Sequence, residues 1–118
     1  MLQKKYRLKN KKAFDATYKN HRVVSNDMLT IYLGKEKKDS CAPTKIGFVV
    51  SKKYHKRAVK RNRIKRLLRE VTRLSIKQEK LGILNKYMSF IMIPKDKTLG
   101  LNYFDIEKSF YKLLEKIR

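Results

Sequence analysis

Ten cationic side chains stand close together in residues 52–69, and no acidic side chain interrupts them. They are Lys52, Lys53, Lys56, Arg57, Lys60, Arg61, Arg63, Lys65, Arg66 and Arg69. Crowding like charges costs electrostatic energy, which a bound polyanion would offset. Asn62 lies within the segment, and its amide can donate and accept hydrogen bonds, whereas an arginine can only donate. These residue types and their spacing predict a phosphate-binding surface.

The same segment carries an apolar pattern of helical period. The apolar residues are Ile64, Leu67, Leu68, Val71 and Leu74. On a helical wheel they share one face, and the opposite face holds Asn62, Lys65, Arg66, Arg69 and Arg73, with Arg61 and Arg63 at its two edges. We therefore expect a helix that packs on a core and ends between residues 76 and 81, with Gly82 as terminator. A merely solvated face is disfavoured because such faces usually mix charge signs.

Residues able to catalyse hydrolysis are not grouped in this sequence. A protein nuclease needs paired carboxylates that hold metal ions, or a histidine with a proton-transfer partner. The ten acidic residues are scattered, and Asp105 and Glu107 point in different directions on a predicted helix. His21 and His55 lack metal-ligand spacing, and Cys41 is the single cysteine. We expect no catalytic residue and no metal site in the protein, so any chemistry would belong to another molecule.

Length and composition agree with a folded nucleic-acid-binding protein. The chain has 118 residues, a formal net charge of +22 and 42% hydrophobic residues, which fits one domain and not a disordered polycation. Its pI near 10.3 makes a phosphate polymer the expected partner. No apolar run approaches the roughly 18 residues that span a bilayer, and the first residues lack the apolar stretch of a secretory signal. We expect a cytoplasmic protein with no membrane partner.

The elements that would position the basic helix follow from periodicity and from turn residues. Asn10 can cap a first helix that runs to Tyr18. Strands are expected at residues 22–24, 28–34, 45–53 and 87–93, and Asn102 can cap a final helix. Two of these strands flank the basic helix, which makes a crossover unit with a default right-handed connection if they are parallel neighbours.

Phe14 and Tyr18 stand four residues apart in the first predicted helix, so they share a face and could touch. They could be core anchors of that helix, the interpretation that the residues alone favour. They could also be a stacking platform for unpaired bases, with Lys11, Lys12 and Lys19 around it. In the strand at 45–53, Gly47 leaves room for a helix, a side chain or a ligand to approach the sheet.

Residues 45–70, KIGFVVSKKYHKRAVKRNRIKRLLRE, closely resemble the protein subunit of bacterial ribonuclease P. Residues 60–66, KRNRIKR, look like the RNR signature of that family, in the helix after its V-S-K-K strand. The early R-L-K with the following Phe14, the strands at 26–33 and 90–94 and the closing helix fit in order and spacing.

The resemblance implies an α+β fold with αβββαβα order in one ribonuclease P protein domain, residues 1–118. It implies a four-stranded mixed central sheet with three helices in a ribosomal-protein-like two-layer arrangement. The crossover through the basic helix would be left-handed, which replaces the default. The family implies a partner catalytic RNA that hydrolyses the 5′ leader from precursor tRNA with Mg²⁺, held mainly by the RNA. The protein would bind both RNAs in this endoribonuclease and need no protein partner.

The resemblance also assigns site residues. Those matching the family's helix that faces the catalytic RNA are Arg61, Asn62, Arg63, Lys65, Arg66 and Arg69, flanked by Lys52, Lys53, Arg57 and Lys60. Those matching the family's cleft for the single-stranded leader are Phe14, Tyr18 and Tyr32, with Lys12 beside them. This favours a ligand-facing Phe14. The sequence departs from the family at Tyr18, where Phe is common, and at His55, where Gly is common and where the local turn is in question.

Composition fits a second function class equally well. A ribosomal or chromosomal protein that binds RNA or DNA without processing it would have the same charge and size. A protein nuclease acting alone is a more distant alternative. Stimulation of precursor tRNA cleavage by ribonuclease P RNA at low Mg²⁺ would discriminate between these classes.

Overall fold

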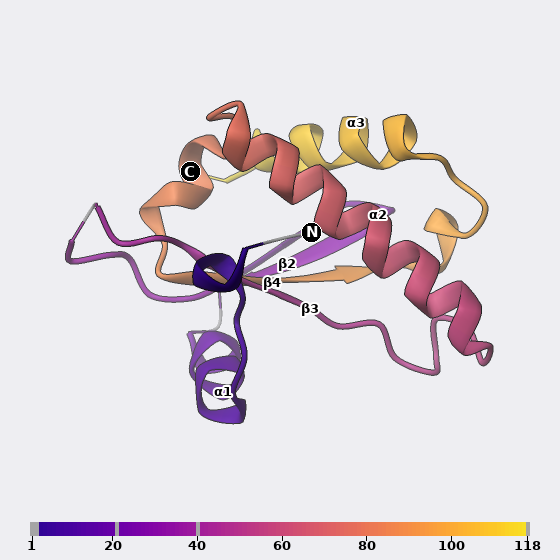
Figure 1. The fold of residues 1–118 in the computed structure, drawn as a ribbon, viewed down its shortest axis with the longest axis horizontal. Coiled ribbons are helices and arrows are strands. Elements are labelled where there is room, and N and C mark those ends of the chain that lie inside the picture. The colour runs from indigo at the N-terminus through magenta and orange to yellow at the C-terminus, as the bar shows by residue number, and fades with distance from the viewer. Residues whose placement is uncertain (1–2, 21, 40, 118) are drawn as a thin grey trace.

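The structure, a computed structural model, describes residues 3–20, 22–39 and 41–117. Its helices and strands follow in the order α1 (Lys11–Lys19), β1 (Arg22–Ser25), β2 (Leu29–Leu33), β3 (Lys45–Phe48), α2 (Ala58–Lys77), β4 (Ser89–Pro94) and α3 (Tyr103–Leu114) (Figure 1). Short 3₁₀ turns are η1 (Lys4–Tyr6), η2 (Gly82–Lys86) and η3 (Asp96–Thr98). The predicted αβββαβα order is confirmed. None of the helices in these ranges is long and apolar enough to cross a membrane.

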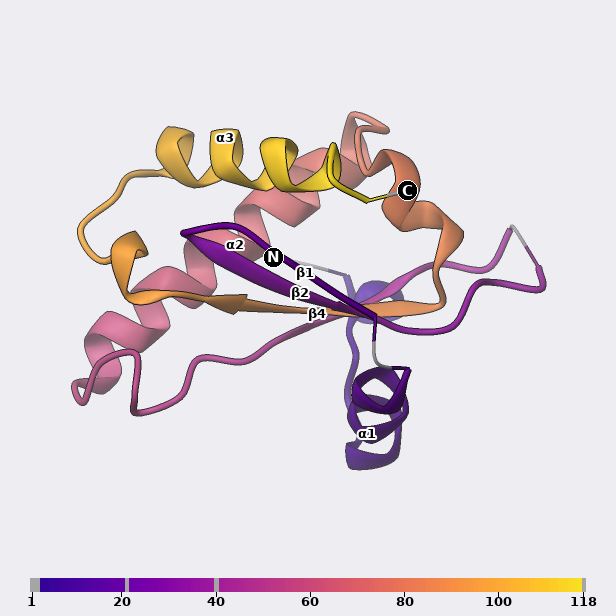
Figure 2. The same cartoon turned by 180° about the vertical axis from the view of Figure 1, so that it is seen from behind.

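The four strands form one mixed sheet in the order β1-β2-β4-β3. The pairs β1–β2 and β2–β4 are antiparallel, and β3–β4 is parallel. Ile46 of β3 lies opposite Phe90 of β4, and Ile31 of β2 lies opposite Met92. These four side chains therefore point to one face of the sheet, which is the face that α2 and α3 cover (Figure 2).

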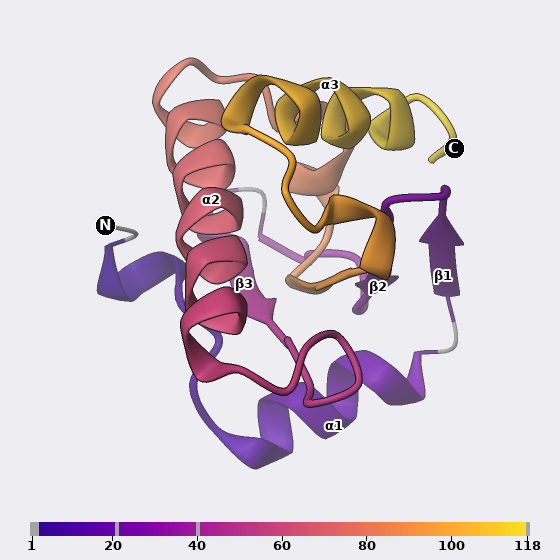
Figure 3. The same cartoon turned by 90° about the vertical axis from the view of Figure 1, so that its right-hand side faces the viewer.

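The connection from β3 through α2 to β4 is left-handed, as the family resemblance implied, and the default right-handed expectation is wrong. In Figure 3, which looks along the strands, β3 lies at the left of the sheet and α2 runs beside it and above it; β4 pairs between β3 and β2. The distribution of apolar side chains explains why α2 lies on this face of the sheet. The stripe of α2 packs where Ile46, Phe90 and Met92 point, whereas the opposite face carries Gly47, Ser89 and α1.

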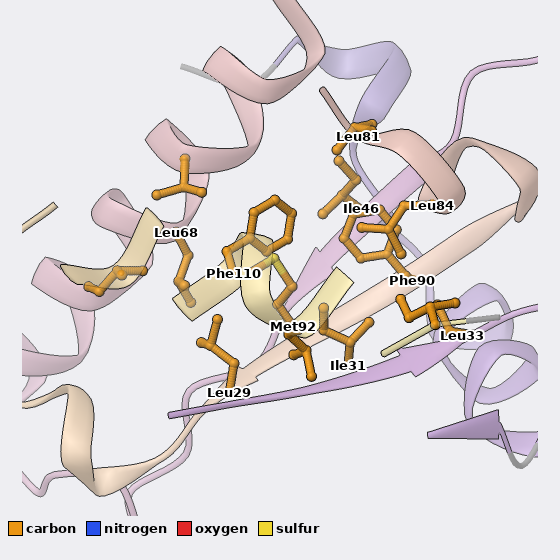
Figure 4. Packing of buried hydrophobic residues seen from close by; sticks show 14 of the residues in the cluster. Leu29, Ile31, Leu33, Ile46, Leu68, Leu81, Leu84, Phe90, Met92 and Phe110 are labelled. Atoms are coloured by element: carbon orange, nitrogen blue, oxygen red, sulfur yellow. The ribbon is translucent and has the colours of Figure 1, made fainter. Parts of the chain in front are cut away.

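The core lies between the sheet and the two longer helices. Leu29, Ile31 and Leu33 alternate inward along β2 and are fully buried, as the strand pattern predicted. Leu68 of α2 and Phe110 of α3 close over them (Figure 4). Burial of this apolar surface is the main term that holds α2 in place, since its outer face is cationic.

The structure corrects the expected end of the strand before the basic helix, the start of that helix, and the set of helix residues that are buried. β3 ends at Phe48 and not at residue 53, and residues 52–57 form a turn before α2 begins at Ala58. Leu67 and Leu74 are only half-buried, whereas Thr72 and Ser75 are fully buried.

Two buried hydroxyl groups explain why the apolar residues alone did not predict the buried face of α2. Thr72 Oγ1 donates to Leu68 O (3.1 Å) and Ser75 Oγ donates to Val71 O (2.7 Å). Polar groups satisfied in this way can lie in a core with little desolvation cost.

The helix ends agree with most of the predicted caps. Asn10 Oδ1 accepts from Ala13 N (2.8 Å), and Asn102 Oδ1 accepts from Asp105 N (3.0 Å). α2 ends at Lys77, inside the predicted window, but Gly82 is not its terminator. The left-handed residue after the helix is Glu79, with φ 56°, and Lys80 N donates to Ser75 O (2.7 Å) across the end.

Candidate nucleic-acid interface

The exposed face of α2 presents polar side chains that have no protein partner. Asn62, Arg66 and Arg69 are exposed, and Lys65 is half-buried. Together with Lys60 they make no side-chain hydrogen bond or ion pair within the described part of the chain. A row of donors with this freedom can bind phosphate oxygens without first breaking internal contacts. The predicted exposure is confirmed for Asn62, Arg66 and Arg69, and the ligand that the face binds stays a prediction.

Arg61 and Arg63, at the two edges of that face, are engaged within the protein. Arg61 Nη1 donates to His55 O (2.9 Å) and Lys56 O (3.0 Å). Arg63 Nη2 donates to Leu101 O (2.9 Å), just before α3. Both were expected to contact RNA on equal terms with their neighbours. Their carbonyl partners belong to other segments of the chain, and helical periodicity carries no signal for them.

Arg73 also has a partner on α2, because it forms an ion pair with Glu70. The hydrogen bond from Arg73 lowers the pKa of the Glu70 carboxyl. The pair is partly exposed to solvent, so its stabilising effect is small. Its consequence is that Arg73, unlike Arg66 and Arg69, does not offer an unpaired charge.

The turn at residues 52–57 carries four exposed cationic side chains, Lys52, Lys53, Lys56 and Arg57. Tyr54 points inward, and its hydroxyl lies 2.9 Å from Thr98 Oγ1. His55 Nδ1 accepts from Arg57 N (3.0 Å). In the described ranges Glu79 is the one non-glycine residue with positive φ, so His55 sits in ordinary backbone geometry. The turn therefore forms without the glycine that is common in the family.

Three aromatic rings stand on the face of the sheet opposite α2. Phe14 lies over Gly47, and a Cβ built at Gly47 would be 2.7 Å from the ring carbon Cε1. Tyr18 makes an edge-to-face contact with Tyr32 at 4.9 Å between ring centroids. Burial, followed by the charge of Tyr32, raises the pKa of Tyr18. The space expected at Gly47 is thus filled by a side chain.

The rings are neither core nor fully free. Phe14, Tyr18 and Tyr32 are each half-buried, so one part of each packs and another part remains accessible. Phe14 and Tyr18 contact different strands, and no ring contact joins them among the described residues. Lys12 is exposed, but it lies roughly 160° around α1 from Phe14 and so points away from the rings. The leader-binding role of these residues stays a prediction.

α1 is fixed to the sheet by polar contacts as well as by the rings. Thr17 Oγ1 lies 2.6 Å from Ser89 Oγ. Asn20 Nδ2 donates to Leu33 O (3.1 Å) and Gly34 O (2.8 Å). These contacts set the separation between α1 and the sheet that a strand of nucleic acid would have to fit.

A hollow of about 270 Å³ connects the ring face with the basic helix. It is lined by Arg7, Leu8, Lys9, Phe14, Ile46, Gly47, Phe48 and Arg69. The N-terminal segment reaches it because Leu8 N donates to Ile46 O (2.9 Å), which pairs the segment with the edge of β3. Arg7 and Lys9 were not predicted as site residues, although the basic R-L-K triplet was a visible signal for them.

A second hollow, of about 410 Å³, lies where β3 and β4 end. Its lining includes Ser51, Lys53, Lys95 and Lys97 with Asp27 and Asp96. Lys95 Nζ donates to Asn26 O (2.6 Å), and Lys97 Nζ lies 3.9 Å from Asp27 Oδ2. Lys95 and Lys97 were not among the predicted site residues, since they follow β4 and lie far along the chain from the basic segment.

No group of three or more His, Cys, Asp or Glu side chains that could hold a metal ion occurs in residues 3–20, 22–39 and 41–117. His55 bonds to the backbone of its own turn, and Cys41 is exposed in the loop after β2. His21 lies outside the described residues.

Comparison with known proteins connects this arrangement to one family. The family model Ribonuclease P matches residues 2–118. The ribonuclease P protein component of Finegoldia magna is 33% identical over 115 residues, covering 98% of this chain and 93% of the relative. That of Oceanobacillus iheyensis is 36% identical over 115 residues, covering 98% of this chain and 88% of the relative.

Solved structures give the same result. The RNase P protein of Staphylococcus aureus superposes with a TM-score of 0.72 at 30% identity, and the match covers 93% of each chain. The RNase P protein of Thermotoga maritima gives a TM-score of 0.74 at 23% identity, covering 95% of this chain and 97% of the other, which supports the fold alone.

Proposed function

Because this chain belongs to the ribonuclease P protein family, we propose that it binds two RNAs through two surfaces. Its role is that of the protein component of ribonuclease P, in the 5′ processing of tRNA. The outer face of α2 binds the catalytic RNA. The ring face between α1 and the sheet binds the 5′ leader of precursor tRNA.

The observation that carries this assignment is the row of unpaired donors on α2. Lys60, Asn62, Lys65, Arg66 and Arg69 are held by a helix whose other face is anchored in the core. A rigid, preorganised row of cations loses little side-chain order on binding and releases counterions from RNA. The row is therefore suited to a fixed RNA surface.

The ring face is suited to a flexible single strand. Aromatic rings accept any base by stacking, so they bind an unpaired leader without demanding one sequence. Phe14 packs on Gly47, and Tyr18 and Tyr32 pack on each other, so the rings are held at defined places along the sheet. We assign recognition of precursor over mature tRNA to this surface, because the mature product has no leader.

We assign hydrolysis of the leader to the RNA with Mg²⁺. The interface residues are ammonium and guanidinium groups, which do not fit a metal cation, and Asn62 is the one neutral side chain among the predicted α2 contacts. Mg²⁺, which supplies charge stabilisation to the reaction, is accordingly held by the RNA. The protein acts in the cytoplasm and requires no protein partner.

Reconstitution tests the assignment. Adding the protein to the ribonuclease P RNA of the same organism should allow cleavage of precursor tRNA at low Mg²⁺. Absence of stimulation would favour a general nucleic-acid-binding protein of ribosomal or chromosomal type. Cleavage by the protein without RNA would instead indicate a protein nuclease.

Salt dependence and charge reversal test the α2 surface directly. If about six cationic side chains contact phosphates, the log–log slope of RNA affinity against salt should be about −4 to −5. Arg66→Glu should weaken binding of the catalytic RNA. Lys112→Glu, at an exposed position of α3, is the matched control and should not. A slope near zero, or equal losses for the two variants, would contradict the assignment.

A further inference from the structure

The turn at residues 52–57 places like charges together, and none of its own six residues is acidic. Four of its six side chains are cationic and exposed. The turn leads into α2, whose first turn contains no acidic residue and whose N-cap, Arg57, provides no capping side chain. The positive end of the helix dipole adds to the repulsion. Such a turn needs internal contacts to keep one conformation.

Two contacts from outside the turn hold it. Tyr54 is buried, and its hydroxyl pairs with Thr98 Oγ1, which anchors the inner side of the turn. Arg61 lies one helical turn into α2 and extends back towards the turn. Its Nη1 donates hydrogen bonds to both His55 O and Lys56 O. Arg61 is thereby bonded to two consecutive carbonyls on the outer side of the turn.

We infer that Arg61 is a positioning residue, which holds the cationic turn at residues 52–57 in the conformation that binds RNA phosphates. The inference deepens the proposed function and rests on it, since it assigns to one residue of the α2 surface a role through its neighbours. One nitrogen of the guanidinium serves both carbonyls, which orients the planar group. A lysine keeps the charge and has enough donors for both oxygens, but its side chain is shorter than that of arginine and does not reach as far back towards the turn.

Arg63 provides the internal comparison. It lies two residues further along the same helix and also donates to a carbonyl, but that carbonyl is Leu101 O at the start of α3. Loss of its bond leaves the turn untouched. Arg61 and Arg63 therefore have the same side chain and the same type of bond, and differ in the segment that the bond holds.

The experiment compares Arg61→Lys with Arg63→Lys for binding to the catalytic RNA across a salt series. We expect Arg61→Lys to weaken binding by about tenfold or more, because two hydrogen bonds from a charged group to the turn are lost. The salt slope should become shallower by about one to two, because each lost phosphate contact removes about 0.7–0.9. If Lys at position 61 restores affinity and slope, Arg61 is a simple phosphate contact and the inference fails.

A double-mutant cycle separates positioning from general damage. The background Lys52→Gln, Lys53→Gln, Lys56→Gln removes most of the charge that Arg61 positions. In this background Arg61→Lys should have little further effect, whereas Arg63→Lys should have the same effect as in the unmodified protein. Equal effects of Arg61→Lys in both backgrounds would overturn the inference.

Hydrogen exchange in the free protein provides a measurement independent of RNA. Amides of residues 53–57 should exchange faster in Arg61→Lys than in Arg63→Lys, at an unchanged thermal midpoint. Unchanged exchange would overturn the inference even if RNA affinity fell. If the unmodified protein fails to bind ribonuclease P RNA, the proposed function fails, while the exchange data still decide whether Arg61 holds the turn.

Discussion

Gly47 offers a way to move Phe14 without removing it. In Gly47→Ala the new methyl would lie 2.7 Å from Cε1 and 2.8 Å from Cζ of the Phe14 ring, and 3.1 Å from Cδ2 of Leu8. Ordinary contact begins at 3.4 Å. The backbone of Gly47 has no positive φ, so alanine fits the strand itself. The ring, which is the movable part, must shift outward by about 1 Å for the methyl to fit.

The expected effect follows from the energy of stacking. A base stacked on an aromatic ring contributes about 1–3 kcal/mol. Loss of the stack through misplacement of Phe14 should therefore weaken binding of precursor tRNA by about 5- to 150-fold. Mature tRNA has no leader, so its affinity should not change. Binding of the catalytic RNA should fall by less than binding of precursor tRNA, because α2 lies on the other face of the sheet and Arg69 is its one residue in the hollow that Phe14 lines.

The assay measures affinity of the reconstituted holoenzyme for precursor and mature tRNA. Phe14→Ala should reproduce the loss for precursor, and the double variant Gly47→Ala, Phe14→Ala should lose little more, since the ring that the methyl displaces is gone. Equal weakening of both tRNAs in Gly47→Ala would refute the reasoning, as would full additivity of the two substitutions.

Three further predictions concern stability. Thr17→Val should destabilise the protein by about 1–3 kcal/mol in thermal or urea unfolding, because Ser89 Oγ loses its partner at 2.6 Å. Asn102→Ala should lower the free energy of unfolding by about 1 kcal/mol in the same measurement, since the N-cap hydrogen bond of α3 is lost. Burial, with a hydrogen bond to Glu107, raises the pKa of Tyr103 from 10.0 to about 12, which phenolate absorbance should detect. The stability from this raised pKa is complete below pH 10 and is lost as pH rises towards 12, and Glu107→Gln should lower the pKa only partly.

Periodicity predicted the helices and strands well, but it predicted the buried face of the basic helix less well. Strand β2 and the caps Asn10 and Asn102 follow from local signals that the structure confirms. The buried face of α2 includes Thr72 and Ser75. These polar side chains can be buried because their hydroxyls donate to carbonyls of the helix itself. A pattern of apolar residues does not include such positions.

The site was predictable as a set of charges but not as a set of contacts. The wheel placed Arg61 and Arg63 at the edges of the basic face, where the structure has them. It could not reveal that one edge meets His55 O and the other Leu101 O, because these partners depend on how turns and helices pack. For the same reason Phe14 and Tyr18 share a helix face, yet each packs on a different strand.

The handedness of the crossover decides whether the two proposed RNA-binding surfaces can both exist on one four-stranded sheet. A right-handed connection would carry α2 to the face where Phe14, Tyr18 and Tyr32 stand, and the helix would cover the rings. The left-handed connection places α2 with α3 over the apolar face and leaves the ring face to α1 alone (Figure 3). The two surfaces then approach each other around the edge of β3, where Arg69 and Phe14 line one hollow. The left-handed topology therefore separates the charged surface of α2 from the surface that carries the three rings.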